Sequence, residues 1–281
     1  MQVVGVIPAR YASSRFPGKP LADLLGWPLI RHVYERAAGA KTLDRLVVAT
    51  DDQRIEAAVQ AFGGEVLLTA ATHPTGTDRV AEVARMINGE IVVNIQGDEP
   101  LIVPEMIDQL VEPLLAESTL PIGTLCRAIQ VRSDVEALDV VKVVRDRRGN
   151  ALYFSRLPIP YLRPTSGGFT VHGSRFTDEV RSPMTDHESP ATTGHPSSDC
   201  AAEPRWYKHI GLYGYRRDSL LHLAALPPTP LEVAEGLEQL RALEHGFTMR
   251  VVETTHDTIE VDRPEDLRRV AARIREAGGP G

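Results

Sequence analysis

The chain has 281 residues, a length that can hold one large α/β domain or two smaller ones, and its 42% hydrophobic and 25% charged residues are ordinary for a soluble globular protein. Its formal net charge of −7 argues against a nucleic-acid-binding surface, which needs a basic face. No apolar run approaches the ~18 residues of a membrane span, and no signal peptide precedes the first strand. Cys126 and Cys200 lie too far apart in sequence for a disulfide framework or a metal site. We therefore expect a cytoplasmic protein.

The first predicted strand, 3–7, leads into a basic loop and then into an amphipathic helix beginning at Pro28. A loop that leaves the carboxyl end of the first parallel strand lies where open α/β sheets bind ligands. Arg10, Arg15 and Lys19 lie there among hydroxyls, a combination that suits a polyphosphate. The loop matches neither the Walker pattern nor GxGxxG, so the residues alone also allow a solvated surface turn.

Strands and helices then alternate. The helix from Pro28 is followed by a strand at 46–50, and Asp51 and Asp52 can cap the next helix, which Gly63 and Gly64 end. A further strand is predicted at 65–69. This alternation predicts a parallel sheet with helices on both faces.

Two later loops contain candidate ligand-binding residues. The Thr75-Gly76-Thr77 turn is either a helix entry or a ligand loop. The most apolar strand, 91–96, should lie in the middle of the sheet and delivers Asp98 and Glu99 at its end. These acids suit a divalent ion between phosphates, although Asp98 could instead cap the helix that starts at Pro104.

Beyond Pro121 the pattern changes to consecutive strands at 122–129, 140–145 and 151–156, the last two predicted to be an antiparallel pair. The polar stretch 163–205 reads as a mobile loop near the acceptor pocket or a dimer contact. Its histidines show no regular ligand spacing; they are His172, His187 and His195.

The final third contains a strand at 206–216, with His209 and Tyr213 on one face, and a helix at 231–245. A late strand at 249–253 precedes a terminal helix that begins at Pro264. From pattern alone, Asp262 is a suitable N-cap for that helix.

The run R-x-x-S-S-R-x-P-G-K-P-L after the first strand, together with Gln96-Gly97-Asp98-Glu99-Pro100, resembles the sugar nucleotidyltransferases and, in its full form, the 3-deoxy-manno-octulosonate (Kdo) cytidylyltransferase family. The resemblance covers nearly the whole chain except the polar stretch, where the family usually has a shorter connection. It implies a Rossmann-like nucleotidyltransferase fold, homodimerisation, and Mg²⁺-dependent transfer of CMP from CTP to Kdo for lipopolysaccharide or related polysaccharides.

The resemblance also implies roles for individual residues. Lys19, Asp98 and Asp262 are expected to be catalytic, the two aspartates as Mg²⁺ ligands. The residues expected to bind CTP are Arg10, Ser13, Arg15, Lys19, Thr75 and Gly76. The residues expected to bind the sugar acid are Arg79, Gln96, Arg156, His209, Tyr213, Glu238 and Gln239.

We expect a single domain, 1–281, with a nucleotide-binding half (1–120), a smaller mixed or antiparallel sugar-binding and dimerisation part (121–246), and a returning strand with the second aspartate (247–281). Two rivals remain. One is a cytidylyltransferase for a sialic acid or for 8-amino-Kdo, although sialate enzymes begin with a Gly-rich loop. The other is an inactive nucleotide-binding regulator, which could dispense with one of the two aspartates.

Overall fold

The computed structural model describes residues 1–12, 15–162 and 205–276. The predictions for Ser13 and for nearly all of the polar stretch 163–205, including its three histidines, therefore lie outside the described residues. Among the described helices, none combines the length and the apolar character that a membrane crossing requires.

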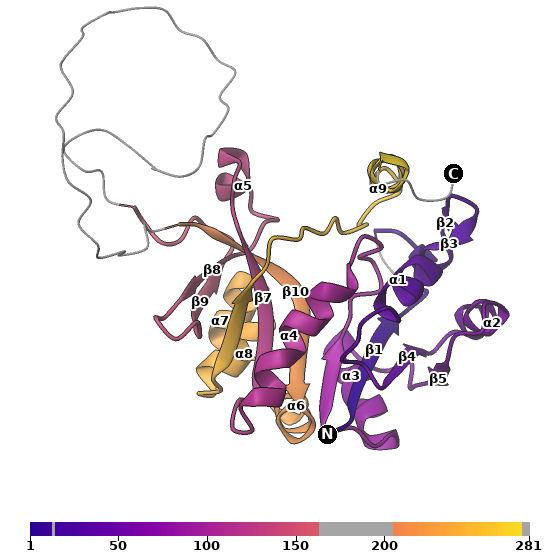
Figure 1. Cartoon of the computed structure of the whole chain (residues 1–281), viewed down its shortest axis with the longest axis horizontal. Helices are drawn as coiled ribbons and strands as arrows, with labels where there is room; N and C mark the ends of the chain where they lie inside the picture. The colour runs from indigo at the N-terminus through magenta and orange to yellow at the C-terminus, as the bar shows by residue number, and fades with distance from the viewer. Residues whose placement is uncertain (13–14, 163–204, 277–281) are drawn as a thin grey trace, which may run out of the picture.

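One sheet organises the molecule (Figure 1). Its main path runs β11-β7-β10-β6-β1-β4-β5, with β6 at the centre. β1 is parallel to β4 and β6, β11 is parallel to β7, and β10 runs antiparallel to both of its neighbours. The predicted α/β class with a mostly parallel sheet is therefore confirmed. The strands are β1 (Val3–Ala9), β4 (Arg45–Thr50), β5 (Val66–Leu68), β6 (Ile91–Asn94), β7 (Ile122–Ala128), β10 (Tyr207–Arg216) and β11 (Met249–Glu253).

The predicted antiparallel pair is also present. β8 (Lys142–Arg145) pairs with β9 (Ala151–Ser155), and β8 extends the main sheet by pairing with the start of β10. A short helix that the sequence analysis missed, α5 (Arg132–Glu136), lies between β7 and β8. The antiparallel region is thus continuous with the nucleotide-binding half.

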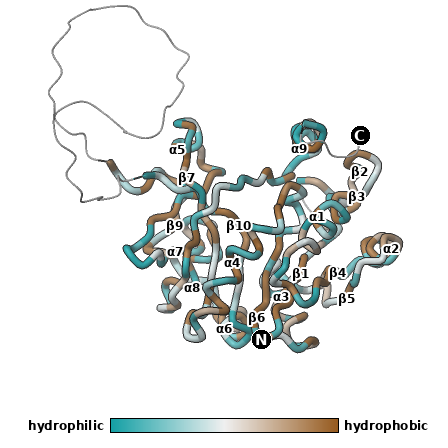
Figure 2. The backbone as a smooth tube through the Cα atoms, in the orientation of Figure 1, coloured by the Kyte–Doolittle hydropathy of each residue, from teal (hydrophilic) through white to brown (hydrophobic). Residues whose placement is uncertain are grey.

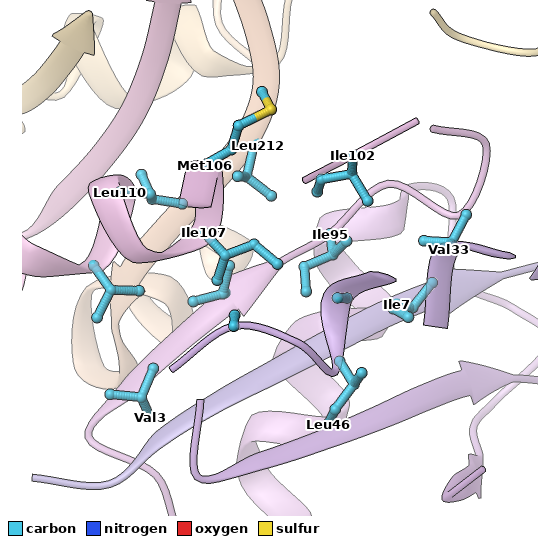
Figure 3. Close-up of a cluster of buried hydrophobic side chains, with 14 of the residues drawn as sticks. Val3, Ile7, Val33, Leu46, Ile95, Ile102, Met106, Ile107, Leu110 and Leu212 are labelled. Atoms are coloured by element: carbon cyan, nitrogen blue, oxygen red, sulfur yellow. The ribbon is translucent and has the colours of Figure 1, made fainter. Parts of the chain in front are cut away.

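Helices cover both faces of the sheet because the strands are apolar on both sides. On one face, α1 (Leu29–Ala37), α2 (Gln53–Ala61) and α4 (Pro104–Ala116) form the core cluster shown in Figure 3. On the other, α3 (Gly76–Met86), α6 (Arg217–Ala225) and α8 (Gln239–Glu244) form a second cluster. Figure 2 shows β1 and β6, which lie between these layers, as hydrophobic stretches.

A third, smaller hydrophobic core packs the last described helix against the rest of the protein. Val261, Val270 and Ile274 pack with Leu24 and Leu29, so α9 (Asp266–Glu276) docks against the hairpin of β2 (Asp23–Leu24) and β3 (Trp27–Pro28). This docking carries residues 260–262 next to the basic loop that follows β1. In sequence, the two segments lie at opposite ends of the chain.

The predicted helix 231–245 is wrong, because it is two helices, α7 (Pro230–Glu235) and α8. Gly236 separates them with a left-handed backbone (φ 63°), a conformation that ends a helix and that glycine adopts without a steric penalty. Thr229 and Glu232 form a capping box at the start of α7. Local helix propensity did not reveal this break.

The capping alternatives for the two aspartates are also resolved. Val103 is the N-cap of α4, so Asp98 does not cap it. At the start of α9 the carboxylate of Asp266, and not that of Asp262, accepts the backbone N–H groups of Asp262 and Arg263. Both Asp98 and Asp262 are left to interact with side chains.

Candidate active site

Two adjoining cavities lie at the carboxyl ends of the central strands. The first has a volume of about 200 Å³ and the second about 110 Å³, and Gly76 and Gln96 line both. The predicted residues that line the first are Arg10, Arg15, Lys19, Thr75, Gly76, Arg79, Gln96, Asp98 and Asp262. Those that line the second are Gly76, Gln96, Tyr213, Glu238 and Gln239.

The basic loop is held in shape by its own backbone. Gly18 has a φ of 74° and its N–H donates to the carbonyl oxygen of Tyr11 at 2.9 Å. A side chain at Gly18 would meet the Tyr11 ring at 3.1 Å. The guanidinium of Arg54 lies over that ring, 3.3 Å from the ring centroid. These contacts set where Lys19 begins the short helix 19–21.

Carboxylates gather opposite this loop. Asp98, Glu260 and Asp262 each offer an oxygen, and these oxygens lie within 4.8 Å of one another. Lys19 Nζ lies 2.6 Å from Asp98 Oδ2 and 3.8 Å from Asp262 Oδ1, and Arg15 Nη1 lies 2.8 Å from Asp262 Oδ2. The loop after β1, the end of β6 and the segment before α9 therefore meet at one point.

The acidic cluster has more negative charge than the neighbouring cationic side chains readily neutralise. Glu260 lies at the exposed edge of the cluster. Partial removal from water, and then the charges of Asp98 and Asp262, raise the pKa of Glu260 to about 7, while Lys19 acts in the opposite direction. Three carboxylates form an all-oxygen donor set, which hard divalent cations prefer. The residues present therefore fit a divalent cation.

Sequence reasoning missed Glu260, although it precedes Asp262 by two positions in an extended segment, where alternate side chains share a side. It also missed His73, which lines the first cavity and pairs with Glu82. The spacing to Asp262 was a usable signal for Glu260. No pattern in the sequence singled out His73.

The Thr75-Gly76 turn is both a helix entry and part of the cavity wall. Thr75 is the N-cap of α3 and forms a capping box with Asp78, while Gly76 lines both cavities. Arg79, one turn later, is buried and its Nη2 lies 2.9 Å from Asp51 Oδ1. Arg79 lines the cavity of the basic loop and not the second one.

The second cavity is lined mainly by polar side chains, together with Leu223 and Met249. Gln96 Nε2 donates to the carbonyl oxygen of Gly211 at 3.0 Å. Burial raises the pKa of the Tyr213 phenol well above its ordinary value, so Tyr213 is a neutral hydroxyl. Burial also raises the pKa of Glu238, against the opposing charge of Arg241. Such a wall suits a ligand with many hydroxyl groups.

Two predicted residues lie outside the walls of both cavities. Arg156 directs its guanidinium to backbone carbonyls: Nε lies 2.8 Å from Glu235 O and Nη1 lies 3.0 Å from Leu138 O. His209 lies next to the second cavity, its ring centroid 5.4 Å from that of Tyr213. Burial lowers the pKa of His209 to about 3, so its imidazole is neutral.

Comparison with known proteins gives consistent matches. Residues 4–255 match the model of a family described as cytidylyltransferase. The chain is 49% identical to a 3-deoxy-manno-octulosonate cytidylyltransferase of Geobacter metallireducens, over 98% of both chains. It is 51% identical to the protein of that name from Syntrophotalea carbinolica, over 98% of this chain and 99% of the relative.

A solved structure is similar as well. It is described as CMP:2-keto-3-deoxy-manno-octonic acid synthetase complexed with CTP, and it superposes with a TM-score of 0.81 at 40% identity. The match covers 99% of this chain and 100% of the other.

Proposed function

Because this chain belongs to the cytidylyltransferase family, and within it to the 3-deoxy-manno-octulosonate cytidylyltransferases, we propose that it transfers CMP from CTP to Kdo and releases pyrophosphate. The observation that carries the proposal is the meeting of Asp98, Glu260 and Asp262 with Lys19 and Arg15 in one cavity. That arrangement combines a cationic cradle for phosphates with an acidic cluster. The product would serve lipopolysaccharide or related polysaccharide synthesis.

In the proposal, Arg10, Arg15 and Lys19 bind the triphosphate. The ammonium of Lys19 has three N–H donors, so it can keep its contact with Asp98 and still donate to a phosphate oxygen. A fixed cation at this point offsets the negative charge that develops as pyrophosphate leaves. Thr75 and Gly76, at the start of α3, contribute to the nucleotide side of the cavity.

Asp98 and Asp262, joined by Glu260, would hold a divalent cation, which we propose is Mg²⁺. When bound, this ion supplies charge neutralisation and Lewis acidity at the phosphates. The protein contributes alignment: the anomeric hydroxyl of the sugar attacks the α-phosphorus directly, and the bond to the pyrophosphate oxygen breaks. No nucleophilic side chain lines the described part of either cavity in a way that suggests a covalent intermediate.

The second cavity would accept the sugar acid. Gln96 lines both cavities and so joins the two substrates, while Tyr213, Glu238 and Gln239 line the acceptor side. Arg156 is proposed to act indirectly on this side, since its contacts hold Glu235 and Gly236 immediately before Glu238. Arg79 is proposed to serve the first cavity.

The proposal is tested by following pyrophosphate release and CMP-Kdo formation from purified protein, CTP, Kdo and Mg²⁺. The variants D98N and D262N should lose turnover while remaining folded. Asp218 supplies a matched control, because its side chain is 97% exposed and lies outside both cavities, so D218N should behave as wild type. Unchanged turnover in D98N and D262N would reject the assignment of these acids.

The choice of acceptor is tested with a panel of Kdo, 8-amino-Kdo and a sialic acid, each with CTP. The names of the relatives favour Kdo, and the basic loop lacks the Gly-rich start of sialate enzymes. An inactive regulator would bind CTP without releasing pyrophosphate with any acid in the panel.

We also propose that the chain forms a homodimer in the cytoplasm. Large apolar side chains are exposed on and beside the β8–β9 hairpin and α7, including Leu152 (61%), Leu157 (61%) and Val233 (72%). Patches of this kind mark protein contacts. Light scattering should give twice the monomer mass for the wild type, and V233E should shift it towards the monomer. The buried, free Cys126 is consistent with a reducing compartment.

A further inference from the structure

The strand β10 is irregular beside the second cavity. Ile210 pairs with Leu125 of β7 and Tyr213 pairs with Thr124, so Gly211 and Leu212 are inserted between successive partners. A bulge of this kind re-aims side chains and leaves backbone carbonyls without their ladder partners. Ile210 and Tyr213 flank the inserted residues, and His209 immediately precedes Ile210.

The buried hydroxyl of Thr124 lies within hydrogen-bond distance of the bulge. Thr124 is 0% exposed, and its Oγ1 lies 2.9 Å from Leu212 O, 3.2 Å from Ile210 O and 2.9 Å from His209 Nε2. Carbonyl oxygens can only accept hydrogen bonds, and the hydroxyl has a single proton to give. Donation to His209 would leave two carbonyl oxygens facing an oxygen with no proton between them.

The arrangement that leaves the fewest of these atoms unpaired has the Thr124 hydroxyl donating to a carbonyl oxygen and Nε2–H of His209 donating to Thr124 Oγ1. The imidazole is neutral, since burial lowers its pKa to about 3, so it carries only that one proton. Nδ1 is therefore left with a lone pair. A threonine hydroxyl thus fixes both the bulge and the tautomer of the histidine.

We propose that Thr124 is a positioning residue that holds His209 in the Nε2–H form, so that Nδ1 accepts a hydrogen bond from a hydroxyl group of the acceptor sugar. The inference rests on the proposed function, in which the sugar acid binds beside Tyr213. It adds a direction to the contact: the histidine accepts and the substrate donates. A site built to accept from a hydroxyl discriminates against an analogue that lacks it, because the accepting nitrogen then loses its donor.

The tautomer of His209 can be determined by NMR in the absence of substrate. Protein labelled with ¹⁵N at its nine histidines gives characteristic signals for protonated and bare ring nitrogens, and H209Q identifies the signals of His209. We expect a protonated Nε2 and a bare Nδ1 in the wild type, and we expect Kdo to shift the Nδ1 signal. A protonated Nδ1 of His209 would overturn the inference, whatever the Thr124 variants do.

Variants test the role of the hydroxyl. T124V removes the hydroxyl with little change of side-chain shape, so His209 should become a mixture of its two tautomers. KM for Kdo should rise by roughly two- to tenfold, which corresponds to the loss of one neutral hydrogen bond. KM for CTP should stay unchanged. T124S keeps the hydroxyl and should restore both readouts. T42V is the control, since Thr42 Oγ1 donates to Asp108 on α4, 2.8 Å away, and the variant should leave both readouts unchanged.

The failure of this inference differs from the failure of the proposed function. If T124V keeps the wild-type tautomer and the wild-type KM for Kdo, Thr124 does not position His209. If the wild-type chain makes no CMP-Kdo, the proposed function fails and the acceptor role of Nδ1 fails with it, while the ¹⁵N spectrum still reports the tautomer.

Discussion

The backbone N–H of Val261 donates a hydrogen bond of 2.9 Å to the carbonyl oxygen of Asp98. This bond joins the segment before the last helix to the end of the central strand β6. Val261 itself is fully buried in the small core that holds α9. The position of Asp262 beside Asp98 therefore depends on the docking of the chain's last described helix.

The first prediction concerns this docking. I274A removes a side chain that is 3% exposed in the core under α9 and should destabilise the protein by about 2–4 kcal/mol. The same change should raise KM for CTP, because Asp262 loses its support. Denaturant unfolding and steady-state kinetics measure the two effects. R273A on the same helix, with a side chain 66% exposed, should change neither.

Lys19 gives the second prediction. K19M should lower kcat/KM for CTP by roughly 10²–10³-fold, the usual loss when one preorganised charge at a transition state is removed. Lys41 is exposed and outside the cavities, so K41M should keep wild-type kinetics. Equal kinetics for K19M and K41M would show that Lys19 has no part in catalysis.

His209 gives a pH prediction. Its pKa is about 3 in the folded protein and about 6.5 when unfolded, so the unfolded state binds more protons between these values. The contribution of the neutral His209 to the free energy of unfolding is fully present above pH 6.5. It falls as the pH drops towards 3, by at most about 1.4 kcal/mol per pH unit. H209Q should therefore lose less stability than the wild type between pH 7 and pH 4.5.

Urea unfolding at a series of pH values measures this slope. The variant H245Q, at an exposed position on the C-terminal side of α8, should keep the wild-type slope. Parallel slopes for the wild type and H209Q would contradict a buried, neutral His209.

Gly236 gives the fourth prediction. Its left-handed backbone separates α7 from α8, so G236A should cost about 1 kcal/mol of stability and disturb Glu238 and Gln239 on the acceptor side. G236N should cost less, because asparagine tolerates this conformation. Thermal unfolding ranks the three proteins, and an order with G236A the most stable would argue against a left-handed Gly236.

Local sequence patterns predicted the strands well because the strands are short, apolar and bounded by clear turns. β11 begins and ends where the sequence analysis placed it, and the antiparallel β8–β9 pair was expected from the turn at Gly149. The helix predicted at 231–245 failed because tertiary contacts decide there: Gly236 breaks a periodic helix. The guanidinium of Arg156 contacts backbone carbonyls that only the fold brings near, and its contact with the sugar acid stays a prediction.

The site itself was predicted by resemblance more than by pattern. From pattern alone, Asp98 and Asp262 could each have been a helix cap, and their meeting depends on the docking of α9, which no local signal reports. Glu260 was overlooked although its spacing of two residues from Asp262 was a usable signal. The roles of these residues remain predictions for the experiments described.

The most direct test of the account is a Mn²⁺ titration followed by electron paramagnetic resonance, with CTP at the same concentration in every sample. The wild type and D218N should bind Mn²⁺ beyond the amount that CTP holds alone, and D98N and D262N should lose that additional binding. Wild-type Mn²⁺ binding in both D98N and D262N would contradict a shared cation site at these two aspartates.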